Sequence, residues 1–253
     1  MKYFAQLVLC VCGCSFCNIW GQEHNHVQIA QQNMPAVVTV NVLTKDASTL
    51  TATGFIVSSD GWMITNQHVL KEALYVNITF SNGATSGEAV LLAQNKQADL
   101  ALLKIEAQHL PHVTLANTDT VWPGQTITVI GNPRRLQNTV TSGIISQLRT
   151  QADGTLWHQI SAPISPSSSG SPVFNAQGEV ISVACASLTG TDNQNLNFAI
   201  PVRYVKQLLA EQHLHLPESA PKEKEIHPFL RHIQKSWEIT KRLFRRWSQG
   251  TQS

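Results

Sequence analysis

The chain has 253 residues, of which 42% are hydrophobic and 13% are charged, and its formal net charge at pH 7 is +2. This hydrophobic content excludes general disorder and suffices for one large domain or two small ones. The charge is uneven: residues 218–253 carry eight Lys/Arg against four Asp/Glu, net +4, whereas residues 22–217 carry nine against twelve, net −3. Because the body is mildly acidic, we predict no nucleic-acid partner.

Residues 1–21 have the features of a secretory signal peptide. Lys2 is followed by an apolar run from Phe4 to Cys17, which is too short for a stable transmembrane helix. We therefore expect export from a bacterial cell, to the periplasm or the extracellular space. An alternative is lipidation at Cys14, because residues 11–14 resemble a bacterial lipoprotein box, although the apolar stretch that follows argues against it.

Cysteine usage indicates a fold without disulfides. Four of the five cysteines lie in the predicted signal peptide, which leaves Cys185. A single remaining cysteine forms no intrachain disulfide, so the fold must rest on its hydrophobic core. Cys185 lies in the apolar run VISVACAS and is predicted to be a small buried residue.

From residue 36 onwards, short segments rich in Val, Ile and Thr alternate with turn signals such as SSDG and SNGATSG. Strands at this spacing predict an antiparallel barrel or sandwich. A second set of such segments follows TVWPGQ, so we predict an N-terminal segment at 22–35 and two β-barrel domains at 36–118 and 119–214. Residues 202–212 place apolar side chains at helical spacing and predict a closing helix.

The C-terminal part is predicted to be a polar linker, residues 215–225, and an amphipathic helix, residues 226–248. One face of this helix is apolar and the opposite face is basic. Three roles stay open for it: packing on the acidic body, lying on an anionic membrane surface, or self-association.

Three polar residues in separate segments are candidates for chemistry. His68 follows the apolar segment WMIT, and Asp99 precedes the apolar segment LALLKI, where a buried carboxylate needs a hydrogen-bonded partner. Ser169 lies in PISPSSSGSPVFN, a tight turn that leads into a strand. Such a turn exposes a hydroxyl near backbone N–H groups that can hold an oxyanion. Each residue alone could be structural, but together they fit the division of labour of a Ser-His-Asp triad.

The motifs resemble, in sequence and in order, the trypsin-like serine proteases of the chymotrypsin fold, and most closely the bacterial HtrA/Deg family. The matching pieces are TGFIVSSDGWMITNQHVL, ADLALLKI, GNPRRLQNTVTSGIISQL, ISPSSSGSPVFNAQGEVISV and LNFAIP. The resemblance implies an all-β fold of two antiparallel Greek-key β-barrels with the triad in the cleft between them. It also implies a serine endopeptidase without cofactor or metal, which cuts exposed or unfolded polypeptides in protein quality control and can form a homo-oligomer.

The same resemblance assigns a role to each candidate. His68 is expected to be the base, Asp99 the residue that orients it, and Ser169 the nucleophile. The oxyanion hole is expected to use the backbone N–H groups of Ser167 and Ser169. Position 167 is usually glycine in the family, and a serine there restricts the backbone if φ must be positive. The alternative function is therefore a catalytically weak, protease-fold binding protein.

Two further expectations come from comparison with the family pattern. Residue 171 is serine where a second glycine is usual, and the stretch after Pro217 is too short for the family's PDZ domain. The primary specificity pocket is expected near Pro163, with walls near 184–186 and 197–199. None of these residues is acidic, so we predict small or medium apolar side chains at the cleaved position.

One further interpretation is metal binding near the mature N-terminus. His24 and His26 lie close to the predicted cleavage site, where a histidine in the third position can hold Cu(II) or Ni(II). Unrelated surface histidines are the alternative account.

Overall fold

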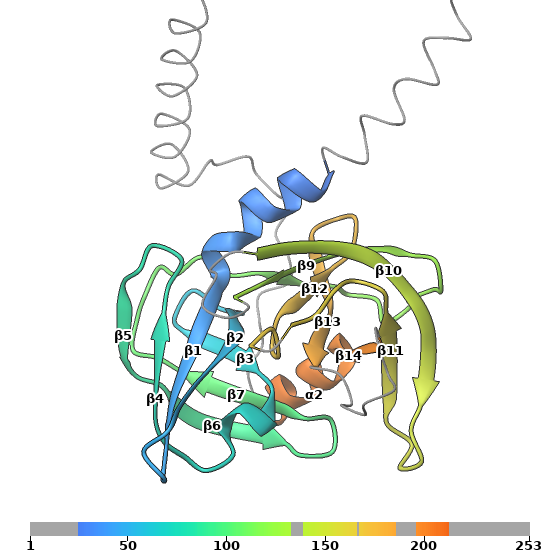
Figure 1. The fold of residues 1–253 in the computed structure, drawn as a ribbon. Coiled ribbons are helices and arrows are strands. Elements are labelled where there is room, and N and C mark those ends of the chain that lie inside the picture. The colour runs from blue at the N-terminus through green and yellow to red at the C-terminus, as the bar shows by residue number, and fades with distance from the viewer. Residues whose placement is uncertain (1–24, 133–138, 166, 186–195, 213–253) are drawn as a thin grey trace, which may run out of the picture. The chain divides into compact units, whose positions relative to one another are not determined.

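The computed structural model describes residues 25–132, 139–165, 167–185 and 196–212, all within one compact unit that ends at Leu216. These residues form two curled sheets of seven strands each (Figure 1), which confirms the predicted all-β, two-barrel fold. The predicted signal peptide, linker and C-terminal helix lie outside the described residues. Among the described residues, no helix has the length and apolar character needed to span a membrane.

The first sheet is antiparallel throughout and has the strand order β5-β4-β1-β2-β3-β7-β6. The turn signal SSDG connects β2 to β3, and SNGATSG leads from β4 into β5. β7 is almost entirely buried, which explains why its sequence, LALLK, shows no alternation of polar and apolar residues. The strands are β1 (Val37–Thr44), β2 (Thr49–Ile56), β3 (Trp62–Thr65), β4 (Ala73–Thr79), β5 (Thr85–Glu88), β6 (Val90–Asn95) and β7 (Leu100–Lys104).

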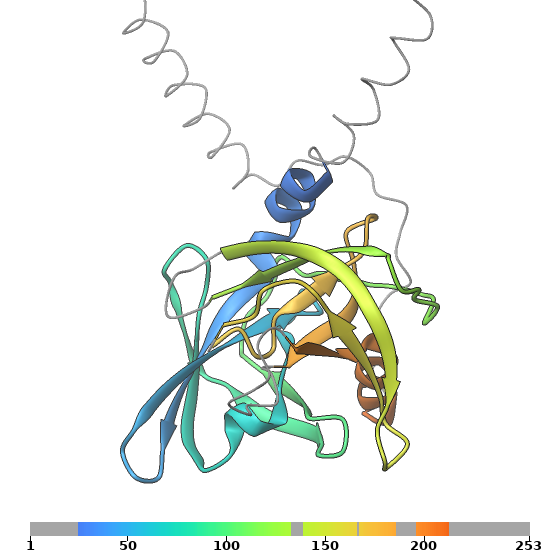
Figure 2. The ribbon, with the colours of Figure 1, turned by 45° about the vertical axis from the view of Figure 1, so that its right-hand side comes forward.

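The second sheet has the strand order β12-β9-β10-β11-β14-β13-β8, and an additional β12–β13 pairing closes six of these strands into a barrel. β10 is its longest strand and curves around the outside of the sheet (Figure 2). β8 pairs parallel with β13, although it precedes the domain boundary predicted at 118/119. The strands are β8 (Thr114–Leu115), β9 (Thr126–Gly131), β10 (Thr139–Thr150), β11 (Leu156–Ile160), β12 (Pro172–Phe174), β13 (Glu179–Cys185) and β14 (Asn197–Pro201).

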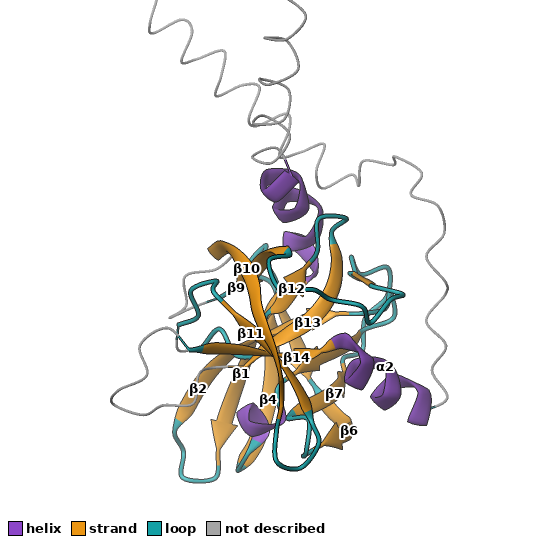
Figure 3. Ribbon diagram, turned by 90° about the vertical axis from the view of Figure 1, so that its right-hand side faces the viewer, coloured by secondary structure: helices purple, strands orange, loops and turns teal. Residues whose placement is uncertain are grey.

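Helices are few and short. The predicted closing helix is confirmed as α2 (Val202–Glu211), which contacts β6 and β7 of the first sheet and β13 and β14 of the second (Figure 3). Two 3₁₀ turns, η1 (Met34–Ala36) and η2 (Gln67–Leu70), precede β1 and follow β3. Residues 25–33 form an N-terminal helix that the sequence analysis did not predict, and it buries Ile29 and Ala30.

The apolar core has three parts. One cluster fills the first sheet around Val40, Ile56 and Leu103. A second fills the closed barrel. The third includes Phe55 from the first sheet, Phe174 from the second and residues of α2. This shared cluster joins the two sheets, because each contributes large side chains that would otherwise be exposed to water. The surfaces that meet at the predicted cleft are therefore held together by core packing.

Candidate active site

The predicted histidine and aspartate lie side by side at one end of the first sheet. β3 pairs antiparallel with β7, so the segment that follows Thr65 lies beside the residue that precedes β7. His68 is in that segment, on η2, and Asp99 is that residue. The Nδ1 atom of His68 is 2.7 Å from Asp99 Oδ2, and the His68 N–H donates to Asp99 Oδ1 at 2.8 Å. Both carboxylate oxygens therefore hold the same histidine.

The backbone of Asp99 is fixed to the histidine segment as well. Its carbonyl accepts hydrogen bonds from the Gln67 N–H at 3.1 Å and from Asn66 Nδ2 at 2.9 Å. Asp99 has a φ of 51°, in the left-handed region that aspartate adopts more readily than most residues. Backbone and side-chain contacts together thus direct the carboxylate towards His68.

A third donor to this carboxylate comes from the second sheet. The Cys185 thiol, at the end of β13, donates to Asp99 Oδ2 at 3.3 Å. Burial raises the pKa of the thiol, and the negative charge of Asp99 raises it further, so Cys185 keeps the proton that it donates. The predicted burial of Cys185 is confirmed, but this contact was missed because the two residues are 86 positions apart in the sequence.

Ser169 is buried in a turn that is fastened to both sheets. Its carbonyl accepts a hydrogen bond from the Thr53 N–H in β2 at 2.9 Å. The hydroxyl of Thr53 donates to the Ser167 carbonyl, also at 2.9 Å. On the other side of the turn, the Gly170 N–H donates to the Ala184 carbonyl in β13 at 2.9 Å. Strands of both sheets therefore position the serine.

Two residues of the turn adopt left-handed backbone conformations. Gly170 has a φ of 87°, and a Cβ at this position would lie 2.0 Å from the Thr53 carbonyl oxygen, so only glycine fits. Ser167 has a φ of 74°, a conformation that costs a residue with a side chain about 1–2 kcal/mol. Its hydroxyl lies 3.4 Å from that of Thr51. The chain therefore has a serine at position 167, where the backbone conformation favours the glycine that is usual in the family.

Thr53 also connects the serine turn with the histidine segment. The hydroxyl of Thr65, at the end of β3, donates to the Thr53 carbonyl at 2.8 Å. A Cβ at Gly170 would lie 2.6 Å from the same hydroxyl. The serine turn thus packs against Thr53 within β2 and Thr65 at the end of β3, after which the chain continues to His68. The fold gathers the segments that carry the three predicted residues where the two sheets meet.

The described residues expected to form the walls of the primary pocket lie on paired strands of the second sheet, and Pro163, expected at its base, follows β11. β13 and β14 are antiparallel, with Ala184 opposite Ala199. Asn197, at the start of β14, is buried and donates to the Ala162 carbonyl at 2.9 Å. These residues carry no charge, and position 186 lies outside the described part of the chain.

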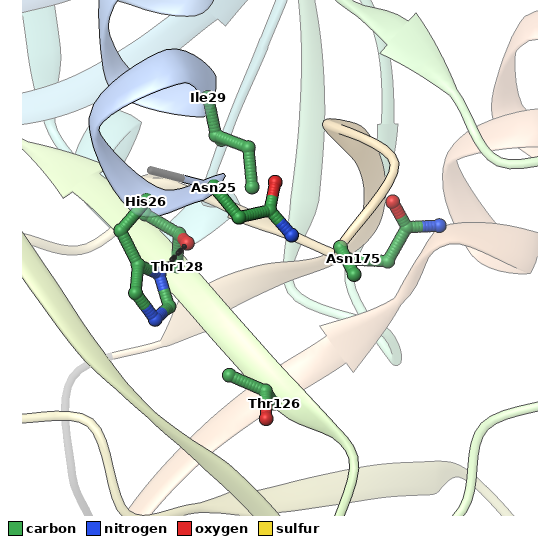
Figure 4. Close-up of a pocket in the computed structure, with 7 residues that line it drawn as sticks. Asn25, His26, Ile29, Thr126, Thr128 and Asn175 are labelled. Atoms are coloured by element: carbon green, nitrogen blue, oxygen red, sulfur yellow. Dashed lines mark hydrogen bonds between the residues drawn. The ribbon is translucent and has the colours of Figure 1, made fainter. Parts of the chain in front are cut away.

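A separate cavity of about 120 Å³ lies between the N-terminal helix and the second sheet (Figure 4). Within it, His26 Nδ1 is 2.6 Å from Thr128 Oγ1, so the ring is held by β9. His24, the other histidine of the suggested Cu(II) or Ni(II) site, lies outside the described residues, and that hypothesis stays a prediction. The cavity is lined by Asn25, His26, Ile29, Thr126, Thr128, Asn175 and Ala176.

Two β-barrels, with a histidine–aspartate pair on one and a serine turn on the other, define the class of chymotrypsin-like proteins. The chain belongs to the family of trypsin-like peptidase domains, whose family model matches residues 52–183. The matched range contains His68, Asp99 and Ser169.

Similar proteins carry HtrA and Deg names, which confirms the resemblance seen in the sequence. The putative serine protease HhoB of Synechocystis sp. is 41% identical over 160 residues, which cover 60% of this chain and 38% of that protein. A probable periplasmic serine endoprotease DegP-like of Chlamydia muridarum is 38% identical over 162 residues, covering 62% of this chain and 32% of that protein. The chain thus spans 38% and 32% of the length of these two relatives.

Solved structures give the same assignment. The HtrA-type protease AlgW with a tripeptide superposes with a TM-score of 0.67 and 28% identity, covering 75% of this chain and 64% of that chain. The serine endoprotease from Yersinia pestis superposes with a TM-score of 0.64 and 31% identity, covering 74% of this chain and 65% of that chain.

Proposed function

We propose that this protein is a serine endopeptidase that hydrolyses peptide bonds of other proteins through an acyl-enzyme intermediate. One observation carries the proposal: both oxygens of the Asp99 carboxylate hold His68, at 2.7 and 2.8 Å, at the end of the strands against which the Ser169 turn packs. Such a carboxylate orients the ring and fixes its tautomer, which is the role of the aspartate in a Ser-His-Asp triad.

The proposed reaction uses each residue once in acylation and again in deacylation. Ser169 Oγ attacks the scissile carbonyl while His68 Nε2 accepts its proton, and the protonated ring then donates that proton to the leaving amine. Asp99 keeps the remaining proton on Nδ1 and stabilises the imidazolium that forms. The backbone N–H groups of Ser167 and Ser169 hold the oxyanion. A water molecule, activated by the same histidine, then releases the acyl group from Ser169.

We further propose that the enzyme acts outside the cytoplasm on exposed or unfolded polypeptide segments. Residues 1–21 have a signal-peptide pattern, and the Chlamydia muridarum relative is named as periplasmic. The uncharged described residues around Ala184 and Asn197 favour small or medium apolar side chains at the cleaved position. A panel of peptides that differ in this one side chain tests the preference, and faster cleavage after lysine or arginine would contradict it.

For the segment at 226–248, the membrane hypothesis has a direct test. Its basic face predicts salt-sensitive binding to anionic vesicles, measured by sedimentation of the full chain beside a form that ends at Pro217. Packing on the protein body or self-association predicts equal sedimentation of both forms with the vesicles. Sedimentation velocity without vesicles then distinguishes packing from self-association. Only self-association makes the number of chains in the sedimenting particle depend on the tail.

A catalytically weak binding protein is the second candidate, and the backbone of Ser167 favours it. A serine at a φ of 74° is strained by about 1–2 kcal/mol, which lowers the fraction of the resting protein that holds this turn conformation. A fluorophosphonate probe decides between the two candidates, because it labels only a serine that its histidine activates. We expect labelling of the unmodified protein, no labelling of Ser169→Ala, and degradation of unfolded casein by the unmodified protein alone. An unlabelled, folded protein that still binds casein would establish the binding function instead.

A further inference from the structure

Three side chains of different chemistry converge behind the histidine ring. His68 Nδ1, an Asp99 carboxylate oxygen and Cys185 Sγ all lie within 4.8 Å of one another. Two of the separations are 2.7 Å, from Nδ1 to Oδ2, and 3.3 Å, from Sγ to Oδ2. The carboxylate oxygen is already a metal ligand, and Nδ1 and Sγ become ligands when they lose the protons that they donate to it.

Imidazole nitrogen, thiolate and carboxylate form a donor set suited to Zn²⁺ and to its softer analogue Cd²⁺. Zinc takes four ligands at about 2.0–2.3 Å, so adjacent ligand atoms in a tetrahedral site are about 3.4 Å apart. The Sγ–Oδ2 separation of 3.3 Å already matches this spacing, and the Nδ1–Oδ2 separation of 2.7 Å must widen. Rotation of the His68 ring, whose side chain is half exposed, would widen it.

An ion can reach this cluster from the histidine side. The side chain of His68 is 46% exposed and that of Asp99 is 19% exposed, whereas Cys185 is buried beneath them. Within the described part of the chain, His68 is the one ion-pair partner of Asp99, so no lysine or arginine there competes with a cation. The fourth position of the ion would be filled by water.

We propose that His68, Asp99 and Cys185 form an inhibitory site for a soft divalent cation of the Zn²⁺ type. Binding releases the thiol proton of Cys185 to solvent and forms a metal–thiolate bond. It also moves the proton of the neutral His68 ring from Nδ1 to Nε2, because Nδ1 must offer its lone pair to the ion. The ring then carries a proton on the atom that must accept one from Ser169.

The inhibition follows from the tautomer and rests on the proposed peptidase function. A ring with a proton on Nε2 has no lone pair there, so it cannot act as base towards Ser169. The histidine and the aspartate alone offer only two ligands, and the thiol of Cys185 supplies the third. Hard cations such as Mg²⁺ prefer oxygen ligands and are not expected to bind here.

The binding test uses the full-length chain with Ser169→Ala, so that the outcome does not depend on activity. Cys10, Cys12, Cys14 and Cys17 are replaced by serine, because they would also bind soft metals. Calorimetric titration with Cd²⁺ is expected to show one bound equivalent, with the ultraviolet charge-transfer band of a Cd–thiolate bond. The matched control adds Cys185→Ser, which retains a hydrogen-bond donor to Asp99 but offers no thiolate. It is expected to lose the band and to bind about 10- to 100-fold more weakly.

The absence of the charge-transfer band in the protein that retains Cys185 would overturn the proposal, even if Cys185→Ser fails to fold. So would equal Cd²⁺ affinity in the two proteins, which would assign the binding to other histidines.

The activity test then measures how Zn²⁺ lowers peptidase activity with Ser169 restored. Each rate is divided by the metal-free rate of the same protein. Cys185→Ser is expected to need about 10-fold or more Zn²⁺ for half inhibition, and equal sensitivity would refute the mechanism. A protein that binds Cd²⁺ through Cys185 but shows no peptidase activity would refute the proposed function and leave the metal site intact.

Discussion

His68 beside the first sheet and His158 in the second each make a short hydrogen bond through Nδ1, yet the two rings are placed differently. His68 of the first sheet bonds the Asp99 carboxylate, and 46% of its side chain is exposed. His158 of the second sheet bonds the Ser182 hydroxyl at 2.6 Å and is only 1% exposed. The partner and the exposure, rather than the residue type, decide whether a histidine can exchange protons with a substrate.

The buried ring shows this most clearly. Burial, together with the positive charge of Arg203, lowers the pKa of His158 from its ordinary 6.5 to about 4. At neutral pH, His158 is therefore an uncharged core residue. His68 has a carboxylate against one nitrogen and solvent on its other side, which is the arrangement that a general base needs.

The strongest test of this contrast is to remove the acid–base pair and the nucleophile. His68→Ala, Asp99→Asn and Ser169→Ala should each lower kcat by about 10⁴-fold without unfolding the protein, because they serve one proton-transfer unit. The losses should not add when variants are combined. Hydrolysis of a peptide substrate and circular dichroism measure the two effects. His158→Gln is the matched histidine control, and it should retain most activity at pH 7. A loss of kcat in this variant equal to that of His68→Ala would contradict the different roles of the two histidines.

The turn of the second sheet should be the next most sensitive feature. Gly170→Ala places a Cβ 2.0 Å from the Thr53 carbonyl oxygen, so the turn has to move. A displacement of about 1 Å at a catalytic group can cost about 10²-fold in rate, and we expect at least that loss of kcat. Gly154→Ala is the control, because Gly154 also has positive φ but has open space at its Cβ position. Similar activity in both variants would show that the Ser169 turn tolerates movement.

The buried histidine should make stability depend on pH. Because the folded pKa of His158 is lower than the unfolded one, the unfolded state binds more protons between pH 6.5 and about 4. The free energy of unfolding should therefore fall as pH decreases through this window, by up to about 3 kcal/mol from this residue, and the loss should be complete below it. Urea denaturation at pH 7 and pH 5 measures the slope. His158→Gln should flatten it, and an unchanged slope in this variant would place its origin elsewhere.

The smallest effect is expected at the oxyanion turn. Ser167→Gly relieves a left-handed serine, so it should stabilise the protein by about 1 kcal/mol and preserve kcat or raise it. Thermal unfolding and peptide hydrolysis check the two expectations. A large loss of kcat would mean that the Ser167 side chain contributes to the site, and its 3.4 Å contact with the Thr51 hydroxyl would then be the first to examine.

The fold and the candidate residues could be predicted because their signals are local in the sequence. A histidine after an apolar strand, an aspartate before another, and a glycine after a serine in a tight turn each identify a position without knowledge of the partner. The closing helix was visible for the same reason, since α2 keeps helical spacing of apolar residues over its whole length.

Contacts between distant segments could not be predicted in this way. The Cys185–Asp99 bond joins the two sheets, and the sequence around Cys185 shows only an apolar strand. His158 lies in the strand LWHQI, where alternation does not say which face will be buried. The two-residue β8 pairs parallel with β13, an arrangement for which such a short segment carries no periodic signal.

The two hydrogen bonds that Thr53 donates to the serine turn affect the order in which the site assembles during folding. His68 and Asp99 are 31 positions apart, and both belong to the first sheet. Ser167 bonds Thr53 across 114 positions, so the chain between them must be ordered before the turn is fixed. A chain that has folded only its first sheet therefore has the histidine and the aspartate in place but no positioned serine. For the peptidase proposed above, completion of the second sheet is therefore the step that positions the nucleophile.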